Sequence, residues 1–125
     1  MIDHFSIGVK NLQVSKAFYQ KTLEPLGYEL RFDNEYAVSF GEPRGSDPAG
    51  DFWLESGQEK PHHFAFSAKT RKEVEDFYHS GLAAGGKDNG APGERNHYHE
   101  GYYAAFIIDP DGNNIEAVCH QEEYN

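Results

Sequence analysis

Two histidines and one glutamate have the residue types of a divalent-metal site and the strand parity that would place them on one face. Residues 4–9 and 63–68 alternate between bulky apolar and small or polar side chains, which is the two-residue period of a half-buried strand. His4 and His63 lie on the polar side of this alternation, and Glu116 lies on the polar side of the last alternating segment. If these polar faces line one concave surface, the three side chains form the two-histidine, one-carboxylate set that leaves coordination positions open on Fe(II). The same set suits Mn, Zn, Ni or Co.

A simpler interpretation is that each histidine is a polar residue at the end of a strand and that Glu116 is a solvated charge. An internal repeat favours the metal interpretation. The repeat has a period of 59 residues, the separation of His4 and His63, and these identities fall in register: His4-Phe5 on His63-Phe64, Lys10 on Lys69, Phe18-Tyr19 on Phe77-Tyr78, Leu23 on Leu82 and Gly27 on Gly86. It indicates a duplicated unit in which His63 is the counterpart of His4.

Each half of the repeat is expected to have the element order βαβββ. The first helix should end near Glu24-Pro25, because proline lacks the N–H that a helix needs, and the second should begin with the capping box Thr70 to Glu73. The predicted strands are residues 5–9, 28–32, 36–40, 52–54, 63–68, 102–108 and 114–119, with one short strand and a long loop in the polar segment 87–101. The predicted fold class is α+β, with one domain over residues 1–125 and modules at roughly 1–58 and 59–125.

The composition excludes several classes of protein. The chain has 11 Lys and Arg against 21 Asp and Glu, and this net charge of −10, with no basic cluster, argues against a nucleic-acid partner. Aliphatic residues are few, but nine Phe and eight Tyr can build a core. The single Cys119 excludes an internal disulfide framework, no apolar run approaches the length of a membrane span, and the chain opens on a strand pattern rather than a signal segment. The sequence therefore predicts a soluble, cytoplasmic protein.

Three stretches of the chain carry the motifs of a known family. They are Ile2-Asp3-His4 with Phe18-Tyr19 in the following helix, the strand His63-Phe64-Ala65-Phe66, and above all D-P-D-G-N-x-I-E at residues 109–116. With these motifs the chain resembles the vicinal oxygen chelate superfamily, which includes glyoxalase I, the bleomycin- and fosfomycin-resistance proteins and the extradiol dioxygenases. The resemblance covers nearly the whole chain. It implies paired βαβββ modules in a U-shaped mixed sheet around a divalent metal ion (Fe, Mn, Ni or Zn), with ligands at the positions of His4, His63 and Glu116.

The resemblance also implies a fourth ligand and a second subunit. Glyoxalase I-like members carry a glutamate on the fourth strand, where Glu55 lies in this sequence. One repeat period before Glu116 is position 57, so a two-residue difference in loop length would make Glu55 its counterpart; the alternative is a solvated charge. Trp53 has the same parity and is expected to form a cavity wall. Members with a single such domain usually form homodimers that often share each site.

Candidate acid–base groups precede the Asp109 turn. His97, His99 and Tyr103 are the predicted catalytic residues, because imidazoles titrate near neutral pH and the extradiol dioxygenases that the chain resembles use an additional His and Tyr. Tyr102 could replace Tyr103 in this role. The alternative is an ordinary exposed loop that leads into a ring-rich strand.

The sequence is consistent with two functions. The first is a metal-dependent lyase or dioxygenase acting on a small oxygen-rich molecule, which three convergent ligands favour. Because the chain has only four arginines amid excess acid, a glutathione conjugate is a disfavoured substrate. The second is a metal-free protein that sequesters a small molecule in an aromatic cleft, as the bleomycin-resistance proteins do.

Overall fold

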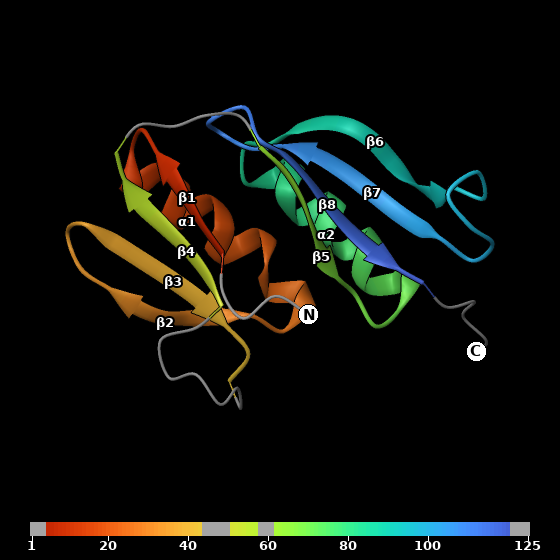
Figure 1. Ribbon diagram of the computed structural model, residues 1–125, viewed down its shortest axis with the longest axis horizontal. Helices are drawn as coiled ribbons and strands as arrows, with labels where there is room; N and C mark the ends of the chain where they lie inside the picture. Colours follow the sequence, from red (N-terminus) through yellow and green to blue (C-terminus); the bar gives the residue numbers. More distant parts are fainter. Residues whose placement is uncertain (1–4, 44–50, 58–61, 121–125) are drawn as a thin grey trace.

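The computed structural model describes residues 5–43, 51–57 and 62–120, and these form two βαβββ units (Figure 1). The first unit contains β1 (Phe5–Val9), α1 (Leu12–Thr22), the short 3-10 helix η1 (Glu24–Leu26), β2 (Glu29–Asp33), β3 (Ala37–Gly41) and β4 (Phe52–Ser56). The second contains β5 (His63–Ser67), α2 (Arg71–Ala83), β6 (Lys87–Glu94), β7 (Tyr103–Ile108) and β8 (Asn114–Cys119). His4 lies outside the described residues.

The two units repeat one sheet topology. The first sheet has the order β1-β4-β3-β2 and the second the order β5-β8-β7-β6. In each sheet the first strand of the unit pairs in parallel with the last, and the other neighbours are antiparallel. The predicted α+β class with paired βαβββ units is therefore confirmed. The structure contains two four-stranded mixed sheets, with α1 behind the first and α2 behind the second in Figure 1.

Side-chain caps fix where both helices begin. The side chain of Asn11 accepts a hydrogen bond from the backbone N–H of Val14 (3.1 Å), and Thr70 accepts one from Glu73 (3.1 Å). The carboxylate of Glu73 also accepts from the backbone N–H of Lys69 (2.9 Å). These bonds satisfy N–H groups that have no partner within the first turn of a helix. The Thr70 bond of the capping box read from the sequence is thus present at the start of α2, whereas the Glu73 carboxylate binds the N–H of the residue before the cap.

Aromatic rings from both units build one core. The ring of Phe52 on β4 lies 5.4 Å from Phe64 and 5.2 Å from Phe66, both on β5, and 5.0 Å from Tyr19 on α1. Phe5 on β1 packs at 5.0 Å from Phe64, and α1 packs against α2. The apolar faces of the two sheets therefore share a single hydrophobic layer, in which large rings compensate for the shortage of aliphatic residues.

A buried carboxylate joins the β7–β8 turn of the second unit to α1 of the first. Asp109, which is 4% exposed, accepts hydrogen bonds from the hydroxyl of Tyr19, from the side-chain amide of Asn113 (2.8 Å) and from the backbone N–H of Asn113 (2.8 Å). Asp111 accepts from the hydroxyl of Ser15 (3.0 Å) and from the backbone N–H of Lys10 (3.1 Å). The Asp-Pro-Asp-Gly-Asn motif thus forms a polar junction between the units as well as a turn.

The element boundaries differ from the sequence-based ones mainly in the second unit. In the polar segment 87–101, expected to hold one short strand and a long loop, the strand is longer than expected: β6 takes residues 87–94, and the rest of the segment is the turn that leads to β7. The pairing of β6 with β7 is irregular between Asp88 and Gly93, which explains why no clear alternation is visible in the sequence. None of the helices in the described part of the chain is long and apolar enough to span a membrane.

Tyr19→Phe tests the polar junction between the units. The substitution keeps the buried ring but removes the hydrogen bond to Asp109, so we expect the free energy of unfolding to fall by about 1–3 kcal/mol, measured by urea denaturation. Tyr36→Phe is the matched control because the Tyr36 side chain is 69% exposed. Equal stability of the two variants would show that the junction contributes little to the fold.

Candidate metal-binding site

His63 and Glu116 lie side by side on the open face of the second sheet, by which we mean the face opposite α2 that carries His63, Ala65, Tyr102, Phe106 and Glu116. Strand alternation places them there, because Phe64, Phe66 and Ile115 all pack in the core. Register then pairs Glu116 with Ala65, two residues along β5 from His63. The result is a separation of 3.3 Å between His63 Nε2 and Glu116 Oε1.

A backbone carbonyl orients the imidazole of His63. Nδ1 lies 2.9 Å from the carbonyl oxygen of Asn114, which can only accept a hydrogen bond, so Nδ1 carries the proton. In the neutral ring Nε2 then presents its lone pair beside Glu116. This is the tautomer in which imidazole binds a metal through Nε2, with its other N–H held by an outer partner.

Tyr102 holds the carboxylate of Glu116. The Glu116 side chain is only 3% exposed, and its second oxygen, Oε2, accepts a hydrogen bond from the hydroxyl of Tyr102. Burial, followed by the hydrogen bond to Glu116, raises the pKa of the Tyr102 phenol above its usual range, so at neutral pH this hydroxyl is a donor and not a base. Glu116 therefore has one oxygen fixed by the protein and the other facing His63.

The pair fits the first two ligands of a divalent ion. Nitrogen and oxygen ligands lie roughly 2.0–2.2 Å from such an ion, so two of them in adjacent positions are about 3 Å apart. The 3.3 Å between Nε2 and Oε1 matches this spacing. Within residues 5–43, 51–57 and 62–120, no group of three or more His, Cys, Asp or Glu side chains is placed to hold a metal. The predicted third ligand, His4, lies outside these ranges.

Strand register corrects the position assigned to Glu55. Phe5 pairs with Phe52 in the first unit, as Phe64 pairs with Ile115 in the second. The residue that corresponds to Glu116 is therefore Trp53, opposite Ser6, whereas Glu55 lies two residues further along β4, opposite Gly8. The equivalence expected from a two-residue difference in loop length is wrong, because the difference is four residues.

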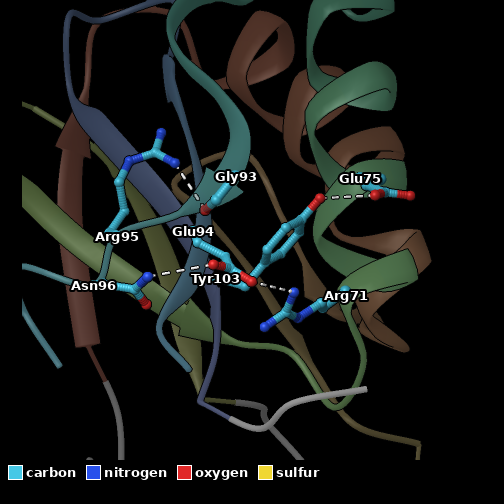
Figure 2. A network of polar contacts seen from close by, with 7 residues as sticks. All are labelled: Arg71, Glu75, Gly93, Glu94, Arg95, Asn96 and Tyr103. Carbon is cyan, nitrogen blue, oxygen red and sulfur yellow. Dashed lines mark hydrogen bonds and ion pairs between the residues drawn. The ribbon is translucent and has the colours of Figure 1, made fainter. Parts of the chain in front are cut away.

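Tyr103 points to the helix side of the sheet, away from His63 and Glu116. Its hydroxyl donates to Glu75 on α2 (2.8 Å), and the guanidinium carbon of Arg71 lies 4.7 Å from the centre of its ring (Figure 2). Burial, followed by the hydrogen bond to Glu75, raises the pKa of Tyr103 to about 12. Adjacent residues of a strand face opposite ways, so the hydroxyl that reaches Glu116 comes from Tyr102 instead.

The two histidines of the predicted acid–base set lie in the exposed turn between β6 and β7. The ring of His99 is 5.3 Å from that of Tyr102, and its Nε2 lies 2.9 Å from Nδ1 of His120. The ring of His97 packs on Tyr98 at 4.3 Å. His99 is therefore connected to Glu116 through Tyr102, whereas His97 packs on Tyr98.

The structure adds Phe106 and Arg95 to the residues expected from the sequence. Phe106 is the register partner of Glu116 on β7, and its ring lies 6.2 Å from that of His63. The guanidinium carbon of Arg95 lies 5.4 Å from the centre of the Phe106 ring. Phe106 shares the parity of Tyr102, a signal available in the sequence, whereas no sequence pattern places the Arg95 side chain over it.

The chain matches one family model and many solved structures. The model described as Glyoxalase/Bleomycin resistance protein/Dioxygenase superfamily matches residues 1–117. A glyoxalase/bleomycin resistance protein from Albidiferax ferrireducens T118 is 31% identical, with a TM-score of 0.79 over 95% of this chain and 98% of that one. A lactoylglutathione lyase from Agrobacterium tumefaciens is 20% identical, with a TM-score of 0.70 over 95% and 92% of the two chains, and shows the fold alone. No curated protein matches the chain.

Tyr102→Phe tests whether the phenol positions Glu116 as a ligand. Loss of an outer hydrogen bond to a metal ligand weakens metal affinity about 10- to 100-fold, and we expect a fall of this size for Ni²⁺, measured by isothermal titration calorimetry. Tyr103→Phe is the control, because the neighbouring hydroxyl faces α2. An equal loss in both variants would indicate a general effect on the strand and would contradict the role of Tyr102.

Proposed function

The chain belongs to the glyoxalase/bleomycin resistance protein/dioxygenase superfamily, and from that premise we propose that it is a divalent-metal-dependent enzyme acting on a small oxygen-rich substrate. The observation that carries the proposal is the pairing of His63 Nε2 with Glu116 Oε1 at 3.3 Å on the open face. Burial of the Glu116 carboxylate costs folding free energy, and a cation bound between Glu116 and His63 would offset that cost.

The proposed ligand set is His63, Glu116 and His4. Strand register supports three ligands over four, since Trp53 occupies the position that would correspond to a second glutamate. Two histidines and one carboxylate leave open positions on the ion for substrate oxygens. The identity of the metal is left among Fe, Mn, Ni and Zn, because the ligand types suit all four.

The residues of this chain would have distinct roles in the reaction. A bound divalent ion supplies a Lewis acid for two adjacent substrate oxygens and for the negative charge that develops on them. His63 and Glu116 would hold that ion, and Tyr102, as a protonated donor, keeps the carboxylate of Glu116 in place. His99 packs against Tyr102 and is hydrogen-bonded to His120, so it is the imidazole best placed to exchange a proton with a substrate at this site.

A metal-free binding protein is the second candidate, and an exposed aromatic pair favours it. On the first sheet the rings of Phe32 and Trp53 pack at 5.4 Å, and Phe32 is 40% exposed. Such a surface suits a planar ligand held by stacking, with no need for a metal.

Metal content separates the two candidates. We expect the purified wild-type chain, reconstituted with Ni²⁺, Zn²⁺, Mn²⁺ or anaerobic Fe²⁺, to retain about one ion per chain by elemental analysis. His63→Ala should lose it, because one of the two paired donors is gone. His79→Ala is the control, since His79 lies on α2 and is not part of the open face. Failure of the wild-type chain to retain any of these ions would reject the enzyme and favour the binding protein.

A homodimer, in the cytoplasm, is the proposed working form. The Phe32–Trp53 pair lies on the helix-free side of the first sheet and is partly exposed in the single chain. A second copy that covered this surface would bury these rings. We expect sedimentation equilibrium at micromolar concentration to give the mass of a dimer, and Trp53→Ser to shift the population toward the monomer. A wild-type monomer would reject the proposed homodimer, and with it any site shared between two subunits.

A further inference from the structure

An arginine lies across the open face of the second sheet next to the proposed site. The chain leaves β6 at Glu94, and the side chain of Arg95 turns back over the strand until its guanidinium carbon lies 5.4 Å from the centre of the Phe106 ring. Figure 2 shows Arg95 on the side of β6 away from α2, whereas Tyr103 points toward the helix. Phe106 in turn contacts His63 and pairs in register with Glu116, so Arg95 shares their face.

Backbone groups of β6 hold the guanidinium in place. Nη1 donates to the carbonyl of Gly93 (2.8 Å) and Nη2 donates to that of Ala91 (2.9 Å). A Cβ atom added at Gly93 would lie 3.1 Å from Nη1, and one added at Gly90 would lie 3.2 Å from Nη2 and 3.0 Å from Cδ1 of Phe106. The two glycines thus leave the space that Arg95 fills. An arginine fixed in this way loses little conformational entropy when it binds a ligand.

The positive charge of Arg95 has no acidic partner among the described residues, in a chain with a net charge of −10. Its neighbour Glu94 turns away and pairs with Arg71 (3.0 Å) and Asn96 (3.3 Å) (Figure 2). Both hydrogen bonds of the Arg95 guanidinium go to neutral carbonyls, and a guanidinium has five N–H donors. Donors are therefore left for a ligand, and their planar arrangement matches a carboxylate.

The charge also lies within electrostatic reach of the proposed site. The guanidinium carbon lies 5.4 Å from the centre of the Phe106 ring, and that ring lies 6.2 Å from the ring of His63. A substrate held at His63 and Glu116 would extend over Phe106 toward the guanidinium.

We propose that Arg95 determines substrate specificity by binding a carboxylate of the substrate. The inference rests on the proposed function and narrows its substrate class to small molecules that carry two adjacent oxygens and a separate carboxylate. Phe106 provides an apolar surface between the two groups, which suits a planar or short carbon skeleton. One arginine can pair with one carboxylate. A ligand with several anionic groups would be repelled by the net negative charge of the protein.

The test compares two probes that differ only in the carboxylate. Both 3,4-dihydroxybenzoate and catechol offer two adjacent oxygens, and their affinities for the Ni²⁺-loaded protein are measured by calorimetry. We expect the wild-type chain to bind 3,4-dihydroxybenzoate about tenfold or more tightly than catechol, the usual effect of a charged hydrogen bond. Arg95→Met should abolish this preference without changing the affinity for catechol. Arg31→Met is the control for net charge, because Arg31 likewise donates to two backbone carbonyls but lies in the first unit.

A measurement without metal keeps this inference separate from the proposed function. In nitrogen NMR spectra of the metal-free protein, benzoate should shift the Arg95 Nε–H resonance and benzyl alcohol should not. In protein shown by elemental analysis to hold Ni²⁺, equal binding of the two dihydroxy probes, including failure of both to bind, would overturn the role of Arg95, and so would an equal loss of both in Arg95→Met. If Ni²⁺ does not bind but benzoate still shifts the resonance, the enzyme proposal fails and the carboxylate site stands.

Discussion

The buried carboxylate of Asp109 is the interaction on which the arrangement of this molecule depends. A carboxylate that is 4% exposed must have its oxygens satisfied, and its donors come from α1 of one unit and from the β7–β8 turn of the other. The same turn is also linked to the proposed metal site by a chain of hydrogen bonds. Asn113 accepts from the backbone N–H of His62 (2.8 Å), the carbonyl of His62 accepts from Asn114 (2.8 Å), and the carbonyl of Asn114 orients the ring of His63. The most specific motif of the sequence therefore couples the packing of the two units to the orientation of a proposed metal ligand.

Strand alternation is the second constraint, and it divides the chemistry of each sheet between two faces. The helix side is filled by rings, which is why so few aliphatic residues are enough for a core. On the open face, polar groups remain available to a ligand. The neighbours Tyr102 and Tyr103 illustrate the division, because one hydroxyl supports Glu116 and the other binds Glu75 on α2. A shift of one residue in the register of β7 would exchange these roles.

Much of this arrangement could be predicted from local patterns. The period of 59 residues corresponds to the offset between Phe5 on β1 and Phe64 on β5, and the parity of β5 and β8 placed His63 and Glu116 on one face. The prediction failed where spacing depended on loops. The segment between β1 and β4 differs in length from its counterpart by four residues, so Trp53 and not Glu55 corresponds to Glu116. The sequence also underestimated the length of β6, because an irregular strand carries no alternation to recognise.

The sequence by itself determined the fold class, the two repeated units and the face on which His63 and Glu116 lie, because each of these follows from the periodicity of neighbouring residues. Only the tertiary structure decided which groups meet. The 3.3 Å between His63 and Glu116, the choice of Tyr102 over Tyr103 and the position of Arg95 over Phe106 depend on strand register and on backbone carbonyls. These are contacts between segments distant in the chain or between a side chain and the main chain, and the periodicity of neighbouring residues does not encode them.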